Sequence, residues 1–212
     1  MPSRSVVSLS GGVDSTTLLH QEHREFAVEP LFIDYGQRAA AREHAAAEWQ
    51  CRALGLTLST LDISAAGEAL GAEQDRRLHV PLPHRNLVLL GLTLSFAVRR
   101  SAGRLALAIN RDDTDAYPSA SADFIDRFRA LAASLGEYTI ATPLVDRGKT
   151  QVIQIGLALG VPFAHTYSCL LGRRAHCGLC PQCRARRKAF AEARASEPPG
   201  FYRRKERRVE SK

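Results

Sequence analysis

The sequence predicts a doubly wound α/β domain, in which helices cover both faces of a parallel sheet, followed by a small cysteine-rich element. Short apolar runs alternate with segments of helical periodicity along most of the 212 residues. A Gly-Gly turn joins the first apolar run to a helical segment, as expected where a parallel sheet begins. Four of the five cysteines lie within residues 169–183, close to the C-terminus.

The predicted elements alternate regularly between strand and helix. Strands are expected at residues 6–9, 28–33, 56–61, 105–109 and 138–141, which are short apolar runs. Helices are expected at residues 14–25, 39–54, 87–98, 123–135 and 149–159, the one at 87–98 apolar enough to pack on both sides. Residues 63–84 combine Gly, Pro and charge with weak periodicity, so they are expected to form a loop or lid.

Composition excludes several classes of protein. Hydrophobic residues make up 45% of the chain, which is enough for a core and too many for a disordered chain. The longest apolar run, residues 87–98, is too short to span a membrane. No secretory signal pattern precedes the first strand, and clustered cysteines favour a reducing compartment. The protein is therefore expected to be cytoplasmic, with no membrane partner.

The net charge of +7 is confined to one end of the chain. Residues 184–212 contain 11 Lys and Arg but only four Asp and Glu, so the rest of the chain is neutral. A basic end of this kind can contact nucleic-acid phosphates. One alternative is therefore a nucleic-acid-binding module, and any such contact is expected at this end of the chain.

The segment Ser10-Gly11-Gly12-Val13-Asp14-Ser15 lies between the first strand and the first helix. Two glycines allow a tight turn whose backbone N–H groups approach a phosphate, and the helix N-terminus adds its positive dipole. The serines can donate hydroxyl hydrogen bonds, and Asp14 can hold Mg²⁺ or cap the helix. The loop lacks the Gly-Lys-Ser/Thr ending of a Walker A loop. A phosphate site is favoured over a plain Gly-Gly turn with capping residues.

Cys169, Cys177, Cys180 and Cys183 are spaced to bind one metal ion. Four thiolates form a closed tetrahedral site, which suits a structural Zn²⁺. An iron–sulfur cluster is the competing interpretation. His176 can replace one thiolate, although four already suffice. Cys51 lies within a predicted helix and is expected to be a small core residue.

The loop at Ser10–Ser15 resembles the PP-loop of the ATP pyrophosphatase superfamily, and with the cysteine cluster nearly the whole chain resembles the 7-cyano-7-deazaguanine synthase (QueC) family. Further segments that match in order are Asp34-Tyr35-Gly36-Gln37-Arg38, Arg85-Asn86-Leu87, Asp113 with Tyr117-Pro118, Thr142-Pro143-Leu144 with Lys149, and Ser168-Cys169. The resemblance implies a Rossmann-like fold of the adenine-nucleotide hydrolase type. It divides the chain into an ATP-binding domain at 1–165, a zinc-binding loop and helix at 166–195 that covers the mouth of the active site, and a basic tail at 196–212.

The resemblance implies an ATP-dependent carbon–nitrogen ligase with ATP, Mg²⁺ and Zn²⁺ as cofactors. ATP would adenylate the carboxylate of 7-carboxy-7-deazaguanine, and ammonia would displace AMP to form the amide. A second activation, of the amide oxygen, would give the nitrile, a precursor of queuosine. A homodimer is also expected, with the helix at 87–98 as the candidate interface.

The resemblance also assigns roles to residues of this chain. The residues expected to bind ATP are Leu9, Ser10, Gly11, Gly12, Val13, Asp14, Ser15, Thr16 and Thr17. Those expected to act in catalysis are Asp14, Ser15, Arg85 and Lys149. Those expected to bind the deazaguanine are Tyr35, Gln37, Arg38, Arg85, Asn86, Asp113 and Tyr117. Arg85 as a solvated first-turn residue and Asn86 as a helix cap are the alternatives.

Two positions depart from the family pattern. Ala39 stands where the family has His, and Ser119-Ala120-Ser121 stands where it has Asp-Cys-Arg. An Asp can accept hydrogen bonds from a guanine-like edge and an Arg can bind a carboxylate, so the departure concerns the substrate and leaves the ATP residues complete. The alternatives are an enzyme that stops at the amide, transfer of the adenylated deazaguanine to a protein or nucleic-acid amine, a tRNA-modifying PP-loop enzyme, and a paralogue that binds ATP without turnover.

Overall fold

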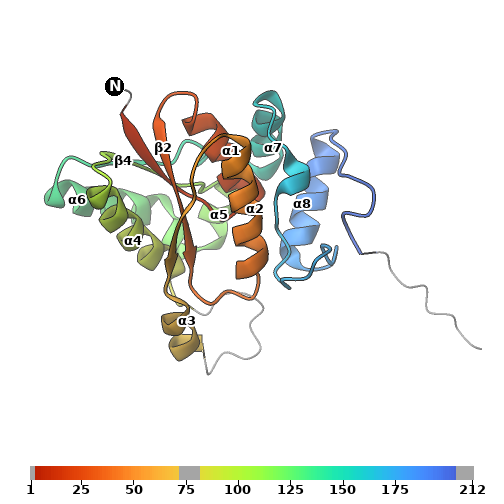
Figure 1. The fold of residues 1–212 in the computed structure, drawn as a ribbon, viewed down its shortest axis with the longest axis horizontal. Helices are drawn as coiled ribbons and strands as arrows, with labels where there is room; N and C mark the ends of the chain where they lie inside the picture. The colour runs from red at the N-terminus through yellow and green to blue at the C-terminus, as the bar shows by residue number, and fades with distance from the viewer. Residues whose placement is uncertain (1–2, 72–81, 204–212) are drawn as a thin grey trace, which may run out of the picture.

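The computed structural model describes residues 3–71 and 82–203, and its sheet has five parallel strands in the order β3-β2-β1-β4-β5 (Figure 1). The strands are β1 (Arg4–Ser8), β2 (Ala27–Asp34), β3 (Ser59–Asp62), β4 (Arg104–Ala106) and β5 (Thr139–Ala141). Strand order runs outward from β1 in both directions, so the carboxyl end of β1 is the switch point at which α/β sheets bind ligands. The predicted doubly wound fold is confirmed.

Helices cover both faces of this sheet. They are α1 (Val13–Glu22), α2 (Ala40–Ala53), α3 (Ser64–Gly71), α4 (Arg85–Arg99), α5 (Arg111–Ala116), α6 (Ala122–Leu135), α7 (Lys149–Ala158) and α8 (Pro181–Glu192), with 3-10 turns η1 (Pro118–Ala120) and η2 (Phe163–His165). Figure 1 shows α1, α2, α7 and α8 on one side of the sheet and α4 and α6 on the other. None of the helices in the described residues is long and apolar enough to cross a membrane.

Two hydrophobic clusters hold these layers together. Successive strand residues point to opposite faces, so the fully buried neighbours Val6 and Val7 belong to different clusters. Val7 packs with α1, α2 and α7, whereas Val6 packs with α4 and α6. Both faces of β1 are therefore covered, which explains why its centre carries two consecutive apolar residues, Val6 and Val7, instead of a strict alternation of apolar and polar residues.

Two predicted segments need correction, and one further helix was not predicted. Part of the predicted loop or lid at 63–84 is the helix α3, and residues 72–81 lie outside the described residues. Helix α5 was not predicted, because a capping box between Asn110 and Asp113 begins it and its sequence has no apolar periodicity. Helix α4 packs on one face only, with Leu87 49% and Val98 54% exposed.

The C-terminal element is fastened by Arg186 on α8, whose side chain is fully buried. Its guanidinium donates hydrogen bonds to the Glu197 carboxylate (2.6 Å), the Phe163 carbonyl (3.0 Å) and the Thr166 hydroxyl (2.9 Å). The guanidinium also lies over the ring of Phe201, 4.4 Å from its centre. One residue therefore joins α8, η2 and the segment that follows α8. The predicted basic tail is described only as far as residue 203.

Candidate functional site

A cavity of about 730 Å³ lies at the carboxyl ends of β1, β2 and β4. Its walls come from the loops after these strands and from the first residues of α4 and α7. The predicted ATP, substrate and catalytic residues that line it are Leu9, Ser10, Gly12, Val13, Asp14, Ser15, Tyr35, Gln37, Arg38, Arg85, Asn86, Asp113, Tyr117 and Lys149. Gly11, Thr16 and Thr17 do not line it, and the two threonine side chains are fully buried in α1.

The loop between β1 and α1 is shaped by close packing against α2. Gly11 has φ +71°, and a Cβ there would lie 2.4 Å from the Glu43 carbonyl oxygen and 2.8 Å from the Ala47 nitrogen. Only glycine therefore allows this approach. The Gly11 carbonyl accepts a hydrogen bond from the Tyr167 N–H (2.8 Å), and the Ser10 N–H donates to the Ser15 hydroxyl (3.2 Å). The loop is thus held in place, with the N-terminus of α1 beside the cavity.

Lys149 and Asp14 form an ion pair across the cavity wall, between the starts of α7 and α1. Burial lowers the pKa of Lys149, but the nearby carboxylates of Asp14, Asp113 and Asp112 outweigh it and raise that pKa, so the ammonium persists. Burial and then the charge of Asp14 raise the pKa of Asp113. The second Asp14 oxygen, Oδ1, is buried with no hydrogen-bond partner among the described residues. An unpartnered carboxylate oxygen beside a phosphate loop fits Mg²⁺, which prefers such ligands.

Arg85 begins α4 and lines the same cavity. Its guanidinium donates a hydrogen bond to the Tyr35 hydroxyl (3.2 Å), and burial raises the pKa of that phenol. Within the described part of the chain Arg85 forms no ion pair with a carboxylate. Asn86 donates to the Ser119 carbonyl (3.0 Å), and the residue that caps α4 is His84. The alternatives of a solvated Arg85 and a capping Asn86 are therefore wrong.

Sequence reasoning missed Glu43, which also lines the cavity. The Gln37 side-chain amide donates a hydrogen bond to its carboxylate (3.1 Å), and burial raises its pKa. A glutamate in the first turn of a helix is the usual complement of the helix dipole, so its sequence position carried no signal of a cavity. Tyr167 and Ser168, in the segment after η2, and Gln182, in α8, were also missed, because they reach the cavity only through the tertiary fold.

The four predicted cysteine ligands form one compact group. Their Sγ atoms all lie within 4.8 Å of one another. The Sγ atoms of Cys177 and Cys183 are 3.8 Å apart, which matches the edge of about 3.8 Å of a tetrahedron with 2.3 Å Zn–S bonds. Burial raises the pKa of Cys177, but the N–H groups of Leu179 and Cys180 outweigh it and bring that pKa to about 7. The group fits a metal that takes four thiolates.

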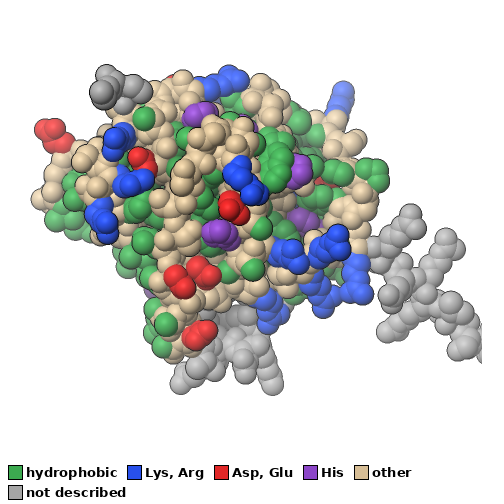
Figure 2. Space-filling model, viewed as in Figure 1, with side chains coloured by type: hydrophobic (Ala, Val, Ile, Leu, Met, Phe, Trp, Pro, Cys, Tyr) green, Lys and Arg blue, Asp and Glu red, His purple; other side chains and the backbone are tan. Residues whose placement is uncertain are grey.

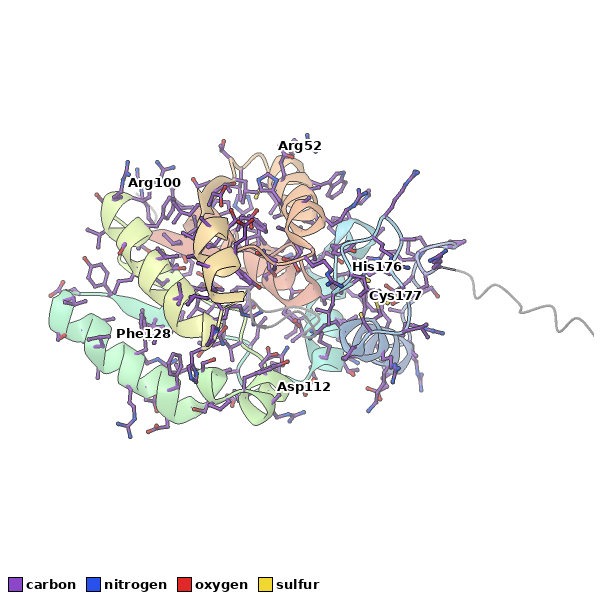
Figure 3. All side chains as sticks on the ribbon, turned by 90° about the horizontal axis from the view of Figure 1, so that it is seen from below. Arg52, Arg100, Asp112, Phe128, His176 and Cys177 are labelled. Atoms are coloured by element: carbon purple, nitrogen blue, oxygen red, sulfur yellow. The ribbon has the colours of Figure 1, made fainter. Side chains whose placement is uncertain are left out.

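His176 is adjacent to the cysteine group and is not part of it. Its Nε2 atom accepts a hydrogen bond from the Ser168 N–H (3.0 Å), and burial and then the charge of Arg186 lower its pKa to about 3. Figure 3 shows His176 and Cys177 side by side in the C-terminal element, far from Phe128 on α6. Its neutral ring supports Ser168 at the cavity wall instead of serving as a metal ligand.

The C-terminal element lies against the cavity mouth. A Cβ at Gly172 would be 2.4 Å from the Arg38 carbonyl oxygen, and Leu170 and Gln182 line the cavity. Figure 2 shows Lys and Arg side chains gathered over this element. The exposed basic residues of the element are Arg173, Arg174, Arg184, Arg187, Lys188 and Arg194. The described part of the basic end predicted at residues 184–212 thus lies on this element and the segment after it, and residues 204–212 lie outside the described residues.

Comparison with known proteins supplies the family. A family model described as "Queuosine biosynthesis protein QueC" matches residues 4–194. The chain belongs to the QueC family. Proteins named 7-cyano-7-deazaguanine synthase resemble it along most of their length. The relative from Methanothermobacter thermautotrophicus is 30% identical, and the match covers 93% of this chain and 99% of the relative. The relative from Pelobacter propionicus is 33% identical, and the match covers 93% of this chain and 97% of the relative.

Solved structures support the fold of this QueC-family chain. The U34-tRNA thiolase NcsA from Methanococcus maripaludis, solved with its [4Fe-4S] cluster, has a TM-score of 0.54 at 14% identity, over 91% of this chain and 70% of its own. An NMN synthetase from Francisella tularensis has a TM-score of 0.53 at 14% identity, and the match covers 94% of this chain and 80% of the synthetase chain. At these identities the likeness concerns the fold alone.

Proposed function

We propose that this QueC-family protein is an ATP-dependent 7-cyano-7-deazaguanine synthase. The observation that carries the proposal is the cavity in which the β1–α1 loop, the Asp14–Lys149 pair and Arg85 meet. Adenylation joins a carboxylate to an anionic triphosphate, so it needs a phosphate cradle and buried positive charge. Relatives that match 93% of the chain carry the name of this activity.

In the first reaction, a carboxylate oxygen of 7-carboxy-7-deazaguanine attacks the α-phosphorus of ATP, and the bond to pyrophosphate breaks. Ammonia then attacks the acyl carbon and AMP leaves, which gives the amide and releases a proton. In the second reaction, the amide oxygen is adenylated by another ATP, and loss of AMP and a proton gives the nitrile. No side-chain nucleophile is required.

The residues of the cavity supply binding and charge for these steps. The N–H groups of the β1–α1 loop hold phosphate oxygens, and the Lys149 ammonium offsets the charge that develops on the leaving pyrophosphate. Arg85 holds the substrate carboxylate near the α-phosphate. Asp14 would hold Mg²⁺ through Oδ1, and the ion would neutralise phosphate charge. The four cysteines would hold Zn²⁺ in a closed site that stabilises the C-terminal element and takes no part in the chemistry.

The direct test incubates the protein with ATP, MgCl₂, 7-carboxy-7-deazaguanine and ammonium chloride and identifies products by mass spectrometry. We expect the nitrile and AMP, with turnover reduced at least 100-fold in Asp14→Asn and Lys149→Gln. Asp126→Asn, an exposed change on α6, serves as the matched control and keeps full turnover. Absence of both amide and nitrile from the wild-type reaction would refute the proposal.

The loop at Ser119–Ser121 favours one alternative, in which the product is the amide or a conjugate. This loop presents no carboxylate or guanidinium to the cavity that it borders. Amide without nitrile, or AMP release that requires an added protein or RNA amine, would select that alternative. The cytoplasmic location and the homodimer remain predictions.

A further inference from the structure

Three carboxylates line the cavity, those of Asp14, Asp113 and Glu43. Asp14 is paired with Lys149, and Asp113 lies close enough to both for their charges to act on its pKa. Arg85 lines the same cavity, and its charge acts on the pKa of both Asp113 and Glu43. The mechanism above uses Asp14, Lys149 and Arg85 and leaves Glu43 without a role.

The Glu43 carboxylate is held in one orientation. The Gln37 side chain is almost fully buried, and its amide nitrogen donates to Glu43 Oε2 (3.1 Å). Its amide oxygen accepts the Tyr35 N–H (2.9 Å), which fixes which way the amide points. The backbone of Glu43 packs against Gly11. Glu43 forms no ion pair of 4.0 Å or less within the described part of the chain, so its carboxylate is a positioned hydrogen-bond acceptor that lines the cavity.

This acceptor matches only one part of the reactants. The triphosphate and the substrate carboxylate are anions and would be repelled by it. The Watson–Crick edge of adenine has one donor beside an acceptor nitrogen. A guanine-type ring instead presents two adjacent donors, N1–H and the 2-amino group, which pair with the two oxygens of a carboxylate.

The other candidates for this contact are already engaged or absent. Asp14 is paired with Lys149, and Asp113 accepts the Asn110 N–H in the capping box. In the loop after Tyr117, the Ser119 carbonyl accepts a bond from Asn86 and Ala120 is buried. Of the three carboxylates that line the cavity, Glu43 is the one left for the base.

We propose that Glu43 is the specificity-determining residue of this site, and that its carboxylate accepts hydrogen bonds from N1–H and the 2-amino group of the 7-deazaguanine ring. The inference rests on the proposed function. The 7-substituent lies on the opposite side of the ring from this edge, so a base bound in this way directs its 7-substituent away from Glu43 and into the rest of the cavity. Glu43 then binds the Watson–Crick edge of the base, and Arg85 binds the carboxylate at its 7-position.

The experiment compares binding of two neutral ligands by calorimetry, 7-cyano-7-deazaguanine and its analogue without the 2-amino group. Hydrogen bonds to a charged acceptor contribute about 10- to 100-fold in affinity, so we expect the wild-type protein to prefer the first ligand by that factor. Glu43→Gln should reduce the preference to about 3-fold or less, because its amide N–H₂ faces the 2-amino group. Glu43→Asp, which keeps the charge but withdraws it, should also lose most of the preference.

Two further measurements separate a change of specificity from a loss of fold. Glu48→Gln removes a charge from an exposed position of the same helix and should leave the preference unchanged. The KM for ATP should change less than 3-fold in Glu43→Gln, and the KM for the acid should rise about 10-fold or more. A wild-type preference that survives both Glu43 variants, or a rise confined to the KM for ATP, would overturn the inference. Failure of the wild-type protein to form product would instead overturn the proposed function.

Discussion

Replacing Gly11 with alanine tests whether the β1–α1 loop owes its shape to contact with α2. Placing a Cβ at φ +71° costs about 1–2 kcal/mol. The new atom would also lie 2.4 Å and 2.8 Å from two backbone atoms of α2, and such overpacking costs about 1–3 kcal/mol more. We therefore expect Gly11→Ala to lower the free energy of unfolding by about 2–5 kcal/mol. Because the loop must move, ATP binding should weaken at least 10-fold.

Gly55→Ala is the matched control for Gly11→Ala. Gly55 has φ +67°, almost the same backbone conformation, but no atom lies within 4 Å of its added Cβ. The Gly55→Ala protein should lose only about 1–2 kcal/mol of its free energy of unfolding and should keep its affinity for ATP. Urea unfolding, with the two midpoints compared at a common slope, gives the difference. Equal destabilisation by the two substitutions would show that contact with α2 does not shape the loop.

Three further substitutions test the four-cysteine group, the effect of burial and Asp14 on Asp113, and the contacts by which Arg186 fastens the C-terminal element. Cys180→Ala should lose the bound metal, measured by plasma emission, and should have a lower melting temperature than the wild type. Cys51→Ala, outside the four-cysteine group, should keep its full metal content. Full metal content in Cys180→Ala would contradict the four-cysteine site. Burial and the charge of Asp14 raise the pKa of Asp113 in the folded protein above its unfolded value of about 3.9. The contribution of Asp113 to stability is therefore complete below the unfolded pKa, and it is lost as the pH rises through the raised pKa of the folded state. Urea unfolding without ATP or Mg²⁺ should therefore show Asp113→Asn gaining stability relative to wild type between pH 4 and pH 7, and a pH-independent difference would refute this. Arg186→Met should lower the free energy of unfolding by about 3–5 kcal/mol, because it leaves the Glu197 carboxylate buried without its ion-pair partner. Arg184→Met, at an exposed position of α8, should change that free energy by no more than about 0.5 kcal/mol. Equal effects of the two substitutions would show that Arg186 does not fasten the C-terminal element.

Most of the fold and the two motifs at its ends could be predicted from the sequence because their signals are local. Alternating runs predicted each strand of the sheet, although β3 begins three residues later than expected. The Gly-Gly loop places its chemically specific residues within residues 10–15, and the four cysteines lie within residues 169–183. Helix α5 was missed because a capping box between Asn110 and Asp113 begins it, and α3 because its short sequence is rich in Ala and Gly.

The sequence by itself determined that this chain forms a doubly wound sheet with a phosphate loop and a four-cysteine site. Only the tertiary structure decided which polar residues face the cavity. Glu43 resembles any first-turn glutamate, and Arg186 resembles its exposed neighbours on α8, yet one lines the cavity and the other is fully buried. The physical reason is that a local sequence pattern gives only the hydrophobic periodicity of a segment and the chemical types of its side chains. The burial of a side chain depends on partners far away in the chain, such as Gly11 for Glu43 and Phe163 for Arg186, that the tertiary fold brings beside it.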